Sequence, residues 1–140
     1  MNIHHRKQQG FTMMETLVSI MVVAFGLLGF AAMMAKSVKD NRIAYMRSQA
    51  TMLSYDITER MRVNRQAALS GSYTIGIGST PVGSSVAQLD LIKWKNEVLQ
   101  SLPQGDGAVS VMGDGKTTIT LQWDDDGDGV ATSFVTQTTI

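Results

Sequence analysis

Three aspartates near the end of the chain have the spacing of a cation-binding loop. Asp124, Asp126 and Asp128 alternate along the chain and are followed by Gly129. This is the pattern of the first half of an EF-hand calcium loop, in which alternate carboxylates converge where the backbone turns at the glycine. The twelfth position of such a loop carries a glutamate, but here it is Val135. Two interpretations stay open: a hairpin turn whose charged side chains face water, which is simpler, and a calcium site. No other cofactor is expected.

The residues of common catalytic sites are missing from most of the chain. The sequence has no cysteine, and its two histidines, His4 and His5, lie within the first ten residues. The rest of the chain therefore has neither the thiolate nor the imidazole of the usual nucleophile–base pairs, and it lacks most zinc ligands. It also cannot form a disulfide. We expect a protein that is not an enzyme.

An apolar segment near the N-terminus contains a single carboxylate and determines the surroundings of that group. Residues 11–35 carry a single charge, Glu15, and follow a short leader that contains Arg6 and Lys7. As a helix this segment is about 37 Å long, enough to cross a hydrocarbon core of about 30 Å. A carboxylate inside a membrane is costly and usually has a partner and a function. The alternative is a plain signal anchor in which Glu15 lies at the level of the lipid headgroups.

The sequence Gly10-Phe-Thr-Met-Met-Glu15, preceded by a basic leader, resembles the processing site of type IV prepilins and pseudopilins. The resemblance implies that a prepilin peptidase cuts after Gly10 and that the new N-terminal residue, Phe11, is N-methylated. In a bundle of such helices the amine of Phe11 would be buried without a partner. The Glu15 carboxylate of a neighbouring subunit can pair with it, so that the pair sets the register of assembly.

The same resemblance implies a location and a set of partners. Residues 1–10 would be cytoplasmic, residues 11–35 would cross the inner membrane once, and the C-terminal head would be periplasmic before the subunit enters the pilus fibre. The larger number of Lys and Arg residues after the apolar segment favours the opposite orientation; we follow the resemblance. The implied partners are the prepilin peptidase, major and minor pilins, the inner-membrane assembly platform and a tip adhesin.

Residues 11 to about 68 contain no proline and only two glycines, which predicts one long helix that ends near residues 69–71. Its first half, 11–35, is the transmembrane and assembly segment, and its second half, 36–70, is amphipathic. An apolar stripe recurs there at alternating spacings of three and four: Ile43, Met46, Ala50, Leu53, Ile57 and Met61. We expect this stripe to pack on a sheet rather than in a coiled coil.

The remaining residues, 71–140, form the predicted head. A Gly- and Ser-rich loop over 71–85 leads to a short helix at about 86–101, capped by Ser84 or Ser85. Its predicted inner face is Leu91, Trp94, Val98 and Leu102, and its predicted outer face is Lys93, Lys95 and Glu97. A period of two then predicts a three-stranded antiparallel meander at about 108–138. The expected fold is α+β, a type IV pilin-like lollipop with a long helix, a small sheet and a short second helix.

Two further runs, Gln49 to Asn64 and Asp90 to Pro103, resemble the PilV group of minor pilins. This resemblance implies a structural subunit that primes or modifies pilus assembly and presents partners at the filament. A minor pseudopilin of a type II secretion system has the same signal and is the alternative. A DNA-uptake pilin is less expected because residues 67–140 carry a net charge of −5, so nucleic acid is not an expected partner.

Overall fold

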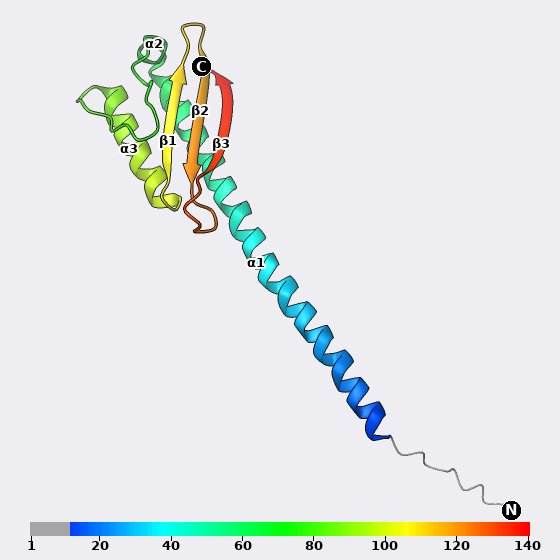
Figure 1. Ribbon diagram of the computed structural model, residues 1–140. Helices are drawn as coiled ribbons and strands as arrows, with labels where there is room; N and C mark the ends of the chain where they lie inside the picture. Colours follow the sequence, from blue (N-terminus) through cyan, green and yellow to red (C-terminus); the bar gives the residue numbers. More distant parts are fainter. Residues whose placement is uncertain (1–11) are drawn as a thin grey trace, which may run out of the picture. The chain divides into compact units, whose positions relative to one another are not determined.

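The computed structural model describes residues 12–140, which form three helices and three strands (Figure 1). The elements are α1 (Met13–Val63), α2 (Arg65–Leu69), α3 (Val86–Ser101), β1 (Asp106–Val111), β2 (Lys116–Trp123) and β3 (Thr132–Thr139). The predicted α+β class is confirmed. The chain divides after Asp40 into two compact units, and α1 contributes to both of them.

The first unit, described over residues 12–40, consists of the N-terminal part of α1. The helix starts at a threonine cap, because the N–H of Glu15 lies 3.0 Å from the carbonyl and 3.3 Å from the hydroxyl of Thr12. Each described residue of this unit is exposed. The unit therefore contains no hydrophobic core of its own.

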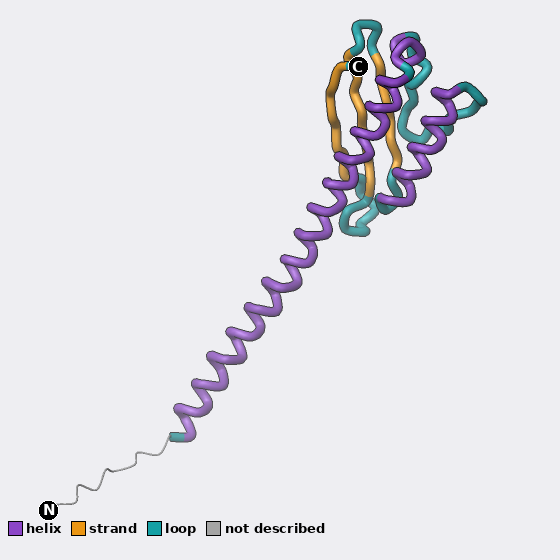
Figure 2. The backbone as a smooth tube through the Cα atoms, turned by 180° about the vertical axis from the view of Figure 1, so that it is seen from behind, coloured by secondary structure: helices purple, strands orange, loops and turns teal. Residues whose placement is uncertain are grey.

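The second unit, Asn41–Ile140, holds a sheet with strand order β1-β2-β3, in which both neighbouring pairs are antiparallel. The C-terminal part of α1 lies across one face of this sheet, and α3 lies beside β1 (Figures 1 and 2). The apolar stripe of α1 contributes five buried residues to the core, and three of them, Ala50, Ile57 and Met61, are completely buried. The predicted docking of this stripe on a sheet is thus confirmed.

The strands follow the predicted meander with small shifts at their ends. β1 begins two residues before the predicted 108, and β3 ends one residue after the predicted 138. Alternate side chains of β2 face the helices and are buried: Thr117, Ile119, Leu121 and Trp123. The turn between β1 and β2 contains Gly115 at φ +86°, a conformation that glycine adopts without steric cost.

The predicted single helix to residues 69–71 is interrupted. α1 ends at Val63, Asn64 has φ −113° and ψ 48°, and α2 then runs to Leu69. The Asn64 side chain donates to the hydroxyl of Tyr73 at 3.4 Å, a contact that reaches outside the helix. After the break, Ala68 is completely buried in the core. The helix is thus interrupted where Asn64 contacts Tyr73, although local helix propensity favours a continuous helix.

Candidate functional site

The N-terminal part of α1 presents an apolar surface that no described residue covers. Its large apolar side chains, from Met13 to Val38, are all more than half exposed. By length and composition the helix could cross a membrane, with a mean hydropathy of 2.4 over its most apolar window. A soluble monomer rarely exposes an apolar surface of this kind. Lipid or other apolar helices are the surroundings that suit it.

Glu15 lies in the first turn of this helix. Between residues 12 and 35 it is the only ionisable side chain, and it is exposed. The unpaired N–H groups of a first turn favour a nearby anion, so the carboxylate suits its position on the helix and is also accessible to a partner. Gly10 and Phe11, the predicted cleavage and methylation residues, lie outside the described residues.

The acidic turn between β2 and β3 is organised around Asp124. Its carboxylate accepts hydrogen bonds from the N–H of Gly127 at 2.7 Å and from the N–H of Gly129 at 3.0 Å. These donors hold the pKa of Asp124 below its usual value. Asp124 is only 5% exposed. The expectation that the charged side chains of this turn face water is therefore wrong for Asp124, because its carboxylate closes the turn.

The structure brings the three predicted cation ligands together. One carboxylate oxygen from each of Asp124, Asp126 and Asp128 lies within 4.8 Å of the others, and the last two residues are exposed. Calcium takes six to eight oxygen ligands, and both oxygens of Asp124 already accept backbone hydrogen bonds. Calcium binding stays a prediction, and a calorimetric titration with calcium tests it.

Arg60 forms an ionic node that the sequence patterns did not predict. Its guanidinium lies 2.8 Å from Asp56, 3.4 Å from Asp90 and 3.5 Å from Glu97, and its side chain is 18% exposed. Burial alone would lower the pKa of Arg60, but Asp56 and the two acidic residues of α3 outweigh burial and raise it. The node ties α1 to α3.

Tyr73 extends this node from the Gly- and Ser-rich loop. Its hydroxyl donates to the second carboxylate oxygen of Asp90 at 2.6 Å, and its side chain is completely buried. Burial, followed by the hydrogen bond to Asp90, raises the pKa of Tyr73 to about 12. Sequence reasoning missed this role, because Tyr73 stands among turn residues without a periodic pattern.

Lys95 faces inward, although the helical pattern predicted an outward side chain. Its ammonium lies 2.8 Å from the Asp106 carboxylate and donates to the carbonyls of Gly76 and Ser79 at 3.1 and 2.6 Å. These partners leave the side chain only 12% exposed. The loop over residues 71–85 folds back over this side of α3 and covers it. Lys95 therefore holds the loop against α3. A disulfide cannot do this, because the chain has no cysteine.

Residues 5–31 match a family model described as a prokaryotic N-terminal methylation motif. The matched range includes Gly10, Phe11 and Glu15. No curated protein and no solved structure matches the chain. The motif supports a type IV pilin-like or pseudopilin protein, a class of structural subunits that are generally not enzymes. It implies interaction with a prepilin peptidase and with other pilins, and together with the apolar helix it fits membrane anchoring and incorporation into a pilus.

Proposed function

We propose that the chain is a PilV-like minor pilin, a structural subunit that primes or modifies assembly of a type IV pilus and presents partners at the filament. The observation that carries the proposal is the methylation motif on an uncovered apolar helix. A helix that leaves lipid must find another apolar environment, and the helices of neighbouring subunits provide one. Glu15 is then the one group on this surface that can select a specific axial offset.

In this proposal the prepilin peptidase cuts between Gly10 and Phe11, and Phe11 is N-methylated. The subunit waits in the inner membrane with its N-terminus cytoplasmic and its head periplasmic. The assembly platform then moves it into the fibre, where the head contacts other pilins or a tip adhesin. Cleavage, methylation and membrane anchoring in this proposal use the segments that contain the motif and the apolar helix.

The two runs that resemble PilV-type pilins lie next to each other in the structure. Arg60 of the first run pairs with Asp90 of the second. The indole N–H of Trp94 donates to the carbonyl of Leu53 at 2.9 Å in the buried core. The residues that carry the resemblance thus form one helix–helix contact, which supports the assignment to this group.

Replacing Glu15 tests the assembly role. We expect Glu15→Ala to leave peptidase cleavage intact and to reduce the amount of the subunit in sheared filaments, because the amine of a neighbouring Phe11 loses its partner. Ser19→Ala is the matched control, since the Ser19 hydroxyl donates only to the carbonyl of Glu15 within its own helix. Unchanged incorporation of Glu15→Ala would count against the pairing.

A minor pseudopilin of a type II secretion system is the alternative, because the motif is common to both systems. The two assignments differ in the fibre that the subunit enters. Fractionation of cells that express the tagged chain distinguishes them: a pilin co-purifies with sheared surface pili, whereas a pseudopilin stays with the secretion apparatus in the cell envelope.

A further inference from the structure

The two edges of the sheet differ in how they are covered. At the β1 edge, Ile75 and Val109 exchange backbone hydrogen bonds of 2.8 and 2.9 Å, so the loop over residues 71–85 pairs with the strand. At the other edge, β3 pairs with β2 on one side only. Across residues 12–140, no segment pairs with the outer side of β3.

The sequence and register of β3 lack the features that usually protect an edge strand. Its sequence, Thr-Ser-Phe-Val-Thr-Gln-Thr-Thr, contains no charge, proline or glycine. Its register with β2 runs one to one over the whole strand, without a bulge. Natural edge strands are commonly short, charged, bulged or covered, because an open edge is a template for another strand. β3 is therefore well suited to pair with a further strand.

The groups available for such pairing can be assigned from the register. The N–H of Ile140 donates to the carbonyl of Gly115 at 3.1 Å. Antiparallel pairs alternate between residues that point toward the neighbour and residues that point away. The backbone groups that point outward thus belong to Ser133, Val135, Gln137 and Thr139. The Arg62 guanidinium approaches the Thr139 carbonyl from this outer side, at 3.4 Å.

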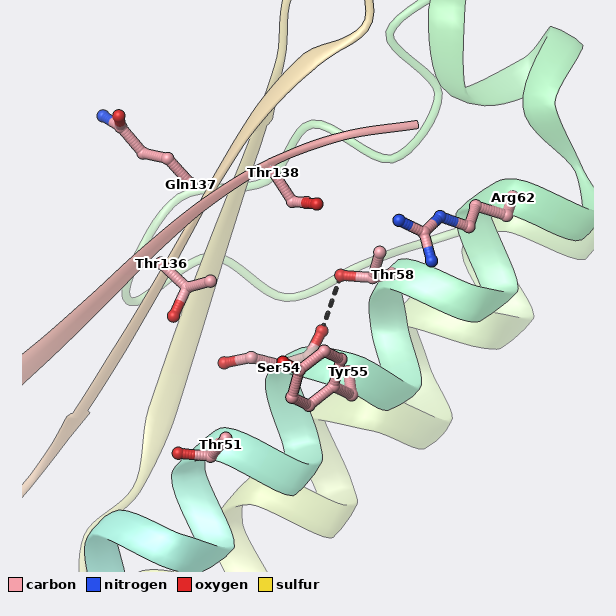
Figure 3. Close-up of a pocket in the computed structure, with 8 residues that line it drawn as sticks. All are labelled: Thr51, Ser54, Tyr55, Thr58, Arg62, Thr136, Gln137 and Thr138. Atoms are coloured by element: carbon pink, nitrogen blue, oxygen red, sulfur yellow. Dashed lines mark hydrogen bonds between the residues drawn. The ribbon is translucent and has the colours of Figure 1, made fainter.

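A slot of about 160 Å³ runs between β3 and α1. In Figure 3, Thr136 and Thr138 of β3 point toward the helix, and Gln137 points away from it. The hydroxyls of Thr51, Ser54 and Thr58 line the helix side and donate to carbonyls of their own helix at 2.9, 2.9 and 2.7 Å. Their lone pairs can accept hydrogen bonds from an occupant.

We propose that the outer edge of β3 and this slot bind an extended segment of a partner protein, which adds to the sheet as an antiparallel fourth strand. The space in the slot favours small side chains on the inner face of the added strand. The exposed carboxylate of Asp128 lies shortly before β3. The C-terminal end of an antiparallel strand would lie beside it, so a basic residue there is favoured.

This charge pattern distinguishes the partner from a second copy of the chain. The end of the chain's own β3, Thr138-Thr139-Ile140, has no basic residue. In a pair of two β3 strands, the strand of the second copy would therefore bring no basic residue of its own to the exposed Asp128 carboxylate. The inference is independent of the proposed function, because it depends only on the head.

Hydrogen exchange of the isotope-labelled full chain in detergent micelles tests the proposal. The probe is the peptide acetyl-Thr-Val-Thr-Val-Thr-Val-Thr-Lys-amide. We expect it to slow exchange at the outward amides of residues 133, 135, 137 and 139. A matched peptide with its lysine moved to the N-terminus should protect them less. No protection at these amides, or equal protection by both peptides, would overturn the proposal.

A proline substitution provides the matched variant. Gln137→Pro removes an N–H that faces solvent, a position where edge strands tolerate proline, whereas Gln137→Ala keeps it. We expect the peptide to protect the alanine variant and not the proline variant. Retained protection of Thr136 and Thr138, which pair with β2, reports an intact sheet. Equal binding by both variants contradicts strand addition, and so does protection that rises with protein concentration without peptide, which would indicate self-pairing.

Discussion

At the scale of single residues, the head depends on side chains that meet backbone directly. Trp94 fills the space between α1 and β1: its indole N–H donates to α1, and its six-membered ring lies on the backbone of Gly107. A Cβ atom added at Gly107 would overlap that ring. The glycine is therefore required by the close approach of the indole and not by a turn.

Replacing Gly107 by alanine should destabilise the head. Relief of the overlap requires movement of a buried tryptophan, and overpacking of this kind costs about 1–3 kcal/mol. Gly113→Ala is the control, because a Cβ there meets nothing within 4 Å. Urea unfolding of both variants measures the difference. Equal stabilities would show that Trp94 can shift without cost.

Two arginines on the last turns of α1 should differ in their contribution to stability. Arg60 contacts three carboxylates and is mostly buried, so we expect Arg60→Gln to lower the free energy of unfolding by about 1.5–3 kcal/mol. Arg62 pairs with Glu59 at the surface, and the same substitution there should cost about 0.2–1 kcal/mol. Thermal or urea unfolding compares them, and a larger loss for Arg62→Gln would contradict the role of the node.

The pair of Lys95 and Asp106 predicts a dependence of stability on pH. Burial would raise the pKa of Asp106, but Lys95 and the N–H groups of Gly78 and Gly107 hold it below its usual 3.8. A carboxyl whose pKa is lowered by folding stabilises the folded state above that usual value, and this stabilisation is lost as the pH falls through the lower, folded value.

We therefore expect Asp106→Asn to have a lower free energy of unfolding than the parent chain at neutral pH. The difference between the two chains should narrow below about pH 3.8. Asp114→Asn is the control, because Asp114 and Lys116 form a pair whose side chains are both more than half exposed. Asp114→Asn should change the free energy of unfolding only slightly at neutral pH. Urea unfolding across this range measures both, and a gap that stays constant in acid would contradict the assignment.

At the scale of elements, hydrophobic periodicity predicted correctly which faces of the helices and strands are buried. It did not predict which distant segments pack against those elements. The inner face of α3, Leu91, Trp94, Val98 and Leu102, is buried as predicted, and Ser85 caps the helix by accepting from the N–H of Gln88 at 3.3 Å. The meander was also predicted, because alternation and turn residues are local signals. These features needed no knowledge of distant segments.

The features that were mispredicted depend on distant residues. Lys95 turns inward because Asp106 and the loop carbonyls come to it from other parts of the chain. α1 breaks at Asn64, where the side chain reaches Tyr73, although local helix propensity continues. Helical spacing indicates which side of a helix a residue occupies, but it does not reveal which segment folds over that side.

The division of α1 predicts that the head folds without the apolar segment. All buried residues of the described chain lie at or after Met46, so a chain that begins at Asn41 retains the whole core. We expect it to be monomeric and to unfold in urea in a single transition. A chain that begins at Thr51 lacks Met46 and Ala50 and should be less stable. Absence of a cooperative transition in the longer chain would contradict this division.

At the scale of the whole molecule, two kinds of surface coexist in one chain. One unit exposes an apolar helix with a single carboxylate, and the other is a packed head with a net negative charge after residue 66. The arrangement suits a subunit that is stored in a membrane and then assembled through its helix. The methylation motif at residues 5–31 connects this arrangement to pilin-like proteins.

The N-terminal chemistry of the mature protein tests the central claim most directly. Mass spectrometry of the chain recovered from sheared filaments should find a protein that begins at N-methylated Phe11, without residues 1–10. The same measurement on cells that lack the prepilin peptidase should find the intact leader and no chain in the filaments. A chain in wild-type cells that keeps its leader, or that is absent from the filaments, would contradict the account.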